Sequence, residues 1–210
     1  KSIQFQDISF QIPQKTIFNS LSITFQNGKK YLIKGESGIG KTTLFQLLTG
    51  ERKPQSGRIL LNDFPLDYYV YSSLFQHVRL IPQKNEFFKV ACKEKISCSK
   101  DSHDTMLKEF EKAGLNYFKL DEVFFQGDTE KISMGEARRL VILRSLFKKG
   151  EWLIMDEPDY ALSSSLAAKI ITDLIKSSES VILFTHRDIF YSCFDEIYEI
   201  KDEKLNRIYR

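Results

Sequence analysis

The stretch that decides the fold is "GESGIGKT", residues 35–42, which matches the pattern G-x-x-x-x-G-K-[ST] at every fixed position. It follows the apolar run "YLIK" and leads into "KTTLFQLLTG", whose apolar positions have helical spacing. Glycines let the backbone approach an anion closely, because a Cβ would block the turn or the approach. The stretch therefore predicts a strand, a phosphate-binding loop and a helix whose N-terminus favours negative charge.

Two side chains of this loop have separate expected roles. Lys41 reaches the β- and γ-phosphates of a nucleotide, and the Thr42 hydroxyl takes a Mg²⁺ position. Backbone amides of the loop supply the remaining phosphate contacts. The predicted nucleotide-binding residues of this segment are Gly35, Glu36, Ser37, Gly38, Ile39, Gly40, Lys41, Thr42 and Thr43.

The composition is that of one large soluble domain, or of one domain that carries a subdomain. The chain has 210 residues, of which 42% are hydrophobic and 28% charged, and its net charge of +3 is too small to indicate nucleic-acid binding. No stretch approaches the ~18 apolar residues of a membrane helix. The three cysteines lack metal-ligand spacing, which favours reduced thiols in the cytosol. The chain starts at Lys1, so we expect a piece of a longer polypeptide, although tag removal explains that start equally well.

The apolar patterns predict strands at both ends of the chain. "SIQFQDISF" and "SLSITFQ" alternate, while "VRLIP", "WLIMD" (152–156) and "VILFT" (181–185) are apolar runs. The helical pattern "SLAAKIITDLIKSS" separates the last two, which indicates parallel strands joined through helices. Residues 89–149 have mostly helical spacing, and "DEIYEIKDEKLNRIY" predicts a hairpin at the edge of the sheet.

Two acidic residues follow the predicted strand 152–156. Asp156 and Glu157 stand at its C-terminal end, the edge where ligands bind in open α/β sheets. Asp156 suits a direct or water-mediated contact with Mg²⁺, and Glu157 suits a general base that polarises water. A lone acidic pair at a strand end is usually only solvated, but a complete phosphate loop in the same chain favours the catalytic interpretation.

A third stretch, "ISMGEARRL" (132–140), has the pattern of a helix start. Ser133 can cap the helix, and Glu136 three residues later completes a capping box. Gly135 is unfavourable in a first helical turn, which suggests that an anion approaches the backbone there. By itself the stretch indicates a plain helix start more strongly than a second anion site.

Taken in order, these motifs resemble those of the ATP-binding cassette (ABC) ATPases. "GESGIGKT" is similar to their Walker A motif, "LIPQ" (80–83) to the Q-loop, "ISMGE" to the signature, "LIMDE" to Walker B, "PDYALS" (158–163) to the D-loop and "FTHR" (184–187) to the H-loop. Six motifs in register over about 150 residues make the resemblance specific.

The resemblance implies an α/β fold, namely a P-loop NTPase (RecA-like) parallel-sheet core with an N-terminal antiparallel β-subdomain and a helical signature subdomain. We expect a single ABC ATPase domain over residues 1–210. Within it, residues 1–88 form the β-subdomain and the first part of the core, about 89–149 the helical subdomain, and 150–210 the rest of the core.

The resemblance also implies a division of roles around Mg²⁺ and ATP. Two cassettes pair head to tail around two ATP molecules, so that Ser133 and Gly135 of one subunit bind the nucleotide held by the other. His186 contacts the γ-phosphate beside Glu157, and Gln83 senses Mg²⁺ and water. The implied catalytic residues are Glu157, His186 and Gln83, and the implied Mg²⁺ ligands are Thr42, Gln83 and Asp156.

The expected partners are a second cassette, identical or different, and the transmembrane domain of a transporter, fused or separate. Both "RLIPQKNEFFKVACKEKIS" and "FFQGDTEKISMGEARR" resemble the exporter type. We therefore expect ATP hydrolysis that powers export at the cytoplasmic side of the cell membrane, with no nucleic-acid partner. The substrate stays open, and so do two alternatives: a non-transport ABC ATPase acting on nucleic acid or ribosomes, and a weakly hydrolysing nucleotide sensor.

Four positions depart from the family pattern. Ile12 stands where members of the family often carry an aromatic that stacks on adenine, with Phe10 or Phe18 as potential substitutes. This predicts weak stacking and a loose choice of nucleobase. Met134 replaces a signature glycine, and Tyr160 and Ser163 replace the usual serine and aspartate of the D-loop. These changes predict slower turnover, or a heterodimer with one weakened site.

Overall fold

The computed structural model describes residues 1–83, 150–160 and 164–209, together with Gly135, Arg138, Arg139, Val141, Ile142 and Ser145. The expected helical subdomain over residues 89–149 lies outside the described residues apart from these six positions, so its bounds stay a prediction. Within the described part of the chain, no helix is long and apolar enough to cross a membrane.

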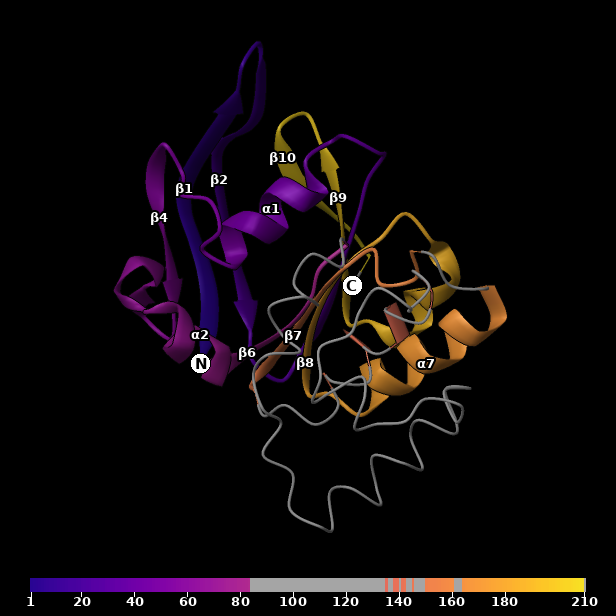
Figure 1. Ribbon diagram of the computed structural model, residues 1–210. Helices are drawn as coiled ribbons and strands as arrows, with labels where there is room; N and C mark the ends of the chain where they lie inside the picture. The colour runs from indigo at the N-terminus through magenta and orange to yellow at the C-terminus, as the bar shows by residue number, and fades with distance from the viewer. Residues whose placement is uncertain are drawn as a thin grey trace.

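The N-terminal sheet is antiparallel, in the strand order β2-β1-β4-β5. Its strands are β1 (Ser2–Ile12), β2 (Lys15–Gln26), β4 (Ser56–Leu61) and β5 (Phe64–Pro65). Burial alternates along β1 on either side of an irregularity between Phe5 and Ile8, as expected for a strand that packs one face on the core. The alternating runs near the N-terminus are confirmed as strands, and they stand together in Figure 1.

The second sheet has six strands in the order β10-β9-β3-β8-β7-β6. They are β3 (Lys30–Lys34), β6 (Val78–Ile81), β7 (Trp152–Asp156), β8 (Ser180–Phe184), β9 (Glu196–Lys201) and β10 (Lys204–Tyr209). All neighbouring pairs are parallel except the β9–β10 hairpin at the edge. The predicted parallel core and edge hairpin are therefore confirmed, with β8 shifted by one residue from the predicted 181–185.

Each face of this second sheet packs against a helix. Helix α1 (Lys41–Leu48) lies between the two sheets in Figure 1, and α7 (Ser164–Lys176) covers the opposite face. Alternate residues of β7 divide accordingly: Trp152 belongs to the core shared with α1, and Leu153 to the core shared with α7. Because both faces are buried, the central strands carry nearly continuous apolar runs.

Three short helices complete the described part: η1 (Leu66–Tyr68) and α2 (Tyr71–His77) before β6, and η2 (Asp188–Cys193) before β9. Parallel strands end at the same edge of a sheet, so the segments that follow β3, β6, β7 and β8 are brought together. Those segments carry the phosphate loop, Gln83, Glu157 and His186, and this edge is where the site forms.

Candidate functional site

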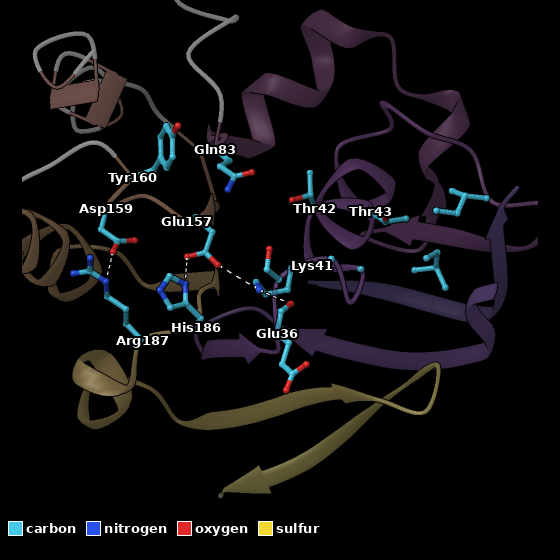
Figure 2. Close-up of a pocket in the computed structure, with 15 residues that line it drawn as sticks. Glu36, Lys41, Thr42, Thr43, Gln83, Glu157, Asp159, Tyr160, His186 and Arg187 are labelled. Atoms are coloured by element: carbon cyan, nitrogen blue, oxygen red, sulfur yellow. Dashed lines mark hydrogen bonds and ion pairs between the residues drawn. The ribbon is translucent and has the colours of Figure 1, made fainter. Parts of the chain in front are cut away.

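A pocket of about 760 Å³ opens at this edge of the sheet, between the phosphate loop and the segments that follow β6, β7 and β8. Most of the residues singled out from the sequence line it (Figure 2). The lining includes Ile12, Glu36, Ser37, Gly38, Gly40, Lys41, Thr42, Thr43, Gln83, Glu157 and His186. The fold therefore brings residues from five separate stretches of the chain into one cavity.

Four of the predicted site residues are described by the structure but do not line the pocket, and a fifth lies outside the described residues. Gly35 and Ile39 belong to the phosphate loop, where a Cβ on Gly35 would lie 2.7 Å from Ile39 Cγ2. Asp156 is buried at the end of β7, with 1% of its surface exposed. Gly135 is helical and does not line this chain's own pocket. Ser133 lies outside the described residues.

The phosphate loop presents the start of helix α1 to the pocket. Gly38 and Gly40 have positive φ angles of 77° and 127°, a region that favours glycine. Helix α1 begins at Lys41 directly after Gly40, with no side-chain cap and no acidic residue in its first turn. The first N–H groups of the helix therefore have no side-chain acceptor, and together with the helix dipole they favour an anion.

Lys41 is held on the inner side of this loop. Its Nζ donates hydrogen bonds to the carbonyls of Gly35 at 2.6 Å and Glu36 at 3.0 Å. The same Nζ lies 3.4 Å from Glu157 Oε1, as Figure 2 shows. Since only 7% of Lys41 is exposed, these contacts compensate for the burial of its charge. The loop thus places a desolvated ammonium where a phosphate can meet it.

Glu157 follows β7 in a strained backbone conformation. Its φ is 41°, which is uncommon for a residue with a side chain, and its N–H donates to the Phe184 carbonyl at 2.9 Å. The carboxylate Oε2 lies 3.0 Å from His186 Nδ1. While Glu157 is ionised it can only accept, so Nδ1 carries the proton and the Nε2 of a neutral ring is an acceptor. The pair is arranged to orient a base beside Lys41.

Asp156 has the burial and the unpaired carboxylate oxygens of a candidate metal ligand. Burial raises the pKa of Asp156 to about 6, and the nearby Thr42 hydroxyl and Lys41 ammonium lower it in part. Neither of its carboxylate oxygens accepts a well-formed hydrogen bond. An orphaned buried carboxylate beside a hydroxyl fits Mg²⁺, which takes oxygen ligands. Among the described residues no three acidic, His or Cys side chains cluster.

One ion pair at the rim of the pocket could not be predicted from the sequence. Arg187 Nε lies 2.5 Å from Asp159 Oδ2, and both residues line the cavity. Only 4% of Asp159 is exposed, so the pair ties the segment after β7 to the segment after β8. Both residues lie inside motifs quoted above, but their opposite charges indicate a contact only once β7 and β8 are known to be neighbours.

At another part of the pocket the lining is aliphatic. Ile12 and Ile17 line it, and Ile12 is 38% exposed. The expectation that Phe10 or Phe18 might take the place of a stacking aromatic is wrong. Both point into the core, with 7% and 0% of their surfaces exposed, and neither lines the pocket. The inward-facing positions of β1 and β2 bury these rings between the sheet and α1.

Comparison with known proteins settles the family. The family model described as "ABC transporter" matches residues 18–160, more than half of the chain. The chain belongs to the ABC transporter family. It is an ATP-binding domain of that family.

Curated relatives of this ABC domain include several transport proteins. The chain is 30% identical to the glutathione/L-cysteine transport system ATP-binding/permease protein CydC of Escherichia coli, over 93% of this chain and 36% of that protein. It is 26% identical to antigen peptide transporter 2 of Rattus norvegicus, over 97% of this chain and 30% of that protein. The chain thus spans about a third of the length of these relatives.

A solved structure supports the fold of the ABC domain. The chain matches the structure described as a bacterial Atm1-family ABC exporter with ATP bound, with a TM-score of 0.77 at 24% identity. The match covers 98% of this chain and 38% of that one. At this identity the likeness establishes the P-loop NTPase fold alone.

Proposed function

We propose that the pocket binds Mg·ATP and hydrolyses it with Glu157 as the general base. The observation that carries this proposal is the position of the Glu157 carboxylate between Lys41 Nζ at 3.4 Å and His186 Nδ1 at 3.0 Å. Lys41 and the N–H groups at the start of α1 bind the phosphates. Glu157 accepts a proton from the attacking water, and His186 orients the carboxylate and contacts the γ-phosphate.

The chain's own residues also provide the groups for a metal ion. Thr42, Asp156 and Gln83 would hold Mg²⁺, and the buried, unpaired carboxylate of Asp156 supports this assignment. A bound Mg²⁺ neutralises charge on the phosphate oxygens. Gln83 lines the same cavity as Glu157, so it is placed to sense the ion and the water together.

The proposal includes a head-to-tail pair of cassettes. Gly135 does not line the pocket of its own chain, and we assign it to the nucleotide of another copy from the family resemblance. Ser133 is assigned the same role from the resemblance alone. The second cassette is an identical copy or a different one, and the D-loop residue Tyr160, 51% exposed at the rim of the pocket, lies where it could meet that partner.

We propose that ATP binding and hydrolysis drive export through a transmembrane domain, which is fused to the cassette or separate from it. The cassette lies on the cytoplasmic side of the membrane. Support comes from the named relatives, one of which is an ATP-binding/permease protein. Exposed apolar side chains also concentrate in one short segment: Phe64, Tyr68 and Val70 are 63%, 79% and 67% exposed. An apolar surface of this kind favours a protein partner over nucleic acid.

The test of this function uses Glu157→Gln, which keeps the shape of the side chain but removes its basicity. We expect ATP binding to be retained, hydrolysis to be abolished and a dimer to accumulate with Mg·ATP. The control is Glu179→Gln, which changes an exposed residue between α7 and β8 and should hydrolyse ATP at the wild-type rate. Hydrolysis by Glu157→Gln at the wild-type rate would show that the base is wrongly assigned. Single-turnover hydrolysis by the wild type separates an ATPase from a nucleotide sensor.

A further inference from the structure

Arg138 is a buried cation beside the site, and like Gly135 it has a helical backbone. None of its surface is exposed, and desolvation lowers its pKa to about 10, so it remains charged at neutral pH. The nearby carboxylates of Asp156 and Asp159 favour its charged form. A cation buried so completely requires hydrogen-bond acceptors for its whole head group.

Three of those acceptors are successive carbonyls around the proposed catalytic base. Arg138 Nε donates to the Pro158 carbonyl at 2.9 Å, and Nη2 donates to those of Glu157 at 3.0 Å and Asp156 at 3.3 Å. Glu157 is the residue with the left-handed φ of 41°. One guanidinium therefore fixes the backbone before, at and after the strained residue.

The remaining acceptors belong to the segment after β6. Arg138 Nη1 donates to the Pro82 carbonyl and reaches the Gln83 carbonyl at 3.5 Å. Strands β6 and β7 are parallel neighbours, and their last paired residues are Ile81 and Met155. Beyond that pair the two segments of the chain are no longer joined by the backbone hydrogen bonds of the sheet. Arg138 supplies the donors that join them there.

The hydrogen bonds of Arg138 show which segments it holds and which it does not contact. A guanidinium has five N–H donors in a rigid plane, and the five carbonyls come from two segments only. None of these five acceptors belongs to the phosphate loop of residues 35–42. A change at Arg138 should therefore disturb Gln83 and Glu157 together, while Lys41 and the phosphate contacts persist.

We propose that Arg138 is a positioning residue for hydrolysis, which holds the backbones of Gln83 and Glu157 in one fixed relation so that both meet the same bound nucleotide. The inference rests on the proposed ATPase function, and it adds a residue that does not line the pocket. Its consequence is specific: removing the planar fork lowers the rate of the chemical step without weakening nucleotide binding.

The experiment compares Arg138→Lys with Arg58→Lys, which changes an exposed arginine of β4 outside the pocket. A lysine keeps the charge but has a single nitrogen, which cannot span carbonyls of two segments. For Arg138→Lys we expect kcat per bound nucleotide to fall by on the order of 100-fold, the cost of displacing reacting groups by about 1 Å. The dissociation constant for ATP should stay within about twofold of the wild type, and Arg58→Lys should leave both unchanged.

Arg138→Ala gives a second readout, because it leaves space for an added guanidinium ion. Millimolar guanidinium should restore part of kcat, and methylammonium at the same concentration should not. Counting turnover per nucleotide-binding site removes any contribution from unfolded molecules. This matters because a purely structural arginine would lower the number of sites rather than the rate at each site.

Two results overturn the inference: a per-site kcat for Arg138→Lys equal to that of the wild type, or a loss of folded sites in both variants with no recovery by guanidinium. In the second case Arg138 acts on the fold alone. If the wild type itself binds ATP but never hydrolyses it, the proposed function fails first. The inference about Arg138 fails alone when the wild type is active and its lysine variant is equally active.

Discussion

The ammonium of Lys41 lies 3.4 Å from a carboxylate oxygen of Glu157, although the two residues belong to motifs in different thirds of the chain. Their side chains are 8% and 10% exposed, so the attraction is only weakly screened by water. The same carboxylate contacts His186 through its other oxygen. Cation, base and imidazole thus form a continuous row across the pocket.

Loss of the Lys41 charge should weaken nucleotide binding. We expect Lys41→Met to weaken ATP binding by about 10- to 100-fold, because charge-assisted hydrogen bonds contribute about 1.5–3 kcal/mol. Lys169→Met removes an exposed lysine of α7 and serves as the control. Titration with ATP followed by calorimetry measures both. An unchanged dissociation constant for Lys41→Met would place the phosphates elsewhere.

Asp156 should make stability depend on pH. Burial raises its pKa from 3.8 to about 6, so between those values the folded protein holds a proton that the unfolded chain releases. This contribution to the free energy of unfolding is present below about pH 4 and is lost as the pH rises through 6. A shift of about two pKa units corresponds to about 3 kcal/mol.

The measurement is urea unfolding from pH 4 to 7.5 without nucleotide or Mg²⁺, comparing the wild type with Asp156→Asn. All other titrating groups are shared, so the stability difference between the two proteins isolates Asp156. As the pH rises from 4 to 7.5, we expect the free energy of unfolding of Asp156→Asn to increase by about 3 kcal/mol relative to that of the wild type. A difference that does not change with pH would mean that Asp156 is ionised throughout.

Because the pocket is aliphatic at Ile12, it should discriminate only weakly between different nucleobases. We expect ATP and GTP to bind the wild type within about fivefold of each other, since neither isoleucine reads the base edge by hydrogen bonds. Ile12→Tyr should strengthen ATP binding, because base stacking on an aromatic ring contributes about 1–3 kcal/mol. Ile208→Tyr, on the edge strand β10, is the matched control. Equal ATP affinity in all three proteins would place the base away from Ile12.

Gly40 and Gly50 test the backbone at the two ends of helix α1. Both have positive φ, 127° and 71°, so alanine at either position costs about 1–2 kcal/mol of backbone strain. A Cβ on Gly40 would also lie 2.6 Å from Ile17 Cγ2, whereas the nearest atom to one on Gly50 is Leu66 Cδ2 at 3.8 Å. Gly40→Ala should therefore destabilise more in urea unfolding and should also weaken nucleotide binding. If Gly50→Ala lowers ATP affinity as much, the effect does not come from the pocket.

Local sequence patterns were sufficient for the long strands and for helices α1 and α7, but they did not indicate α2 or η2. Alternation in β1, continuous apolar runs in β7 and β8, and the glycines before Lys41 each encode a backbone state within a few residues. Because the ends of parallel strands share one edge, the order of the motifs also placed Glu157 and His186 near the phosphate loop. Most of the predicted lining followed from that rule.

By itself, the sequence determined the phosphate loop, the parallel core and the family motifs, since these depend on short-range patterns. Only the tertiary structure decided that Phe10 and Phe18 face the core, that Asp159 pairs with Arg187, and that Arg138 joins two segments. Such contacts link residues far apart in the chain, and no period or spacing encodes them. They depend on which strands become neighbours and on how much water their packing excludes.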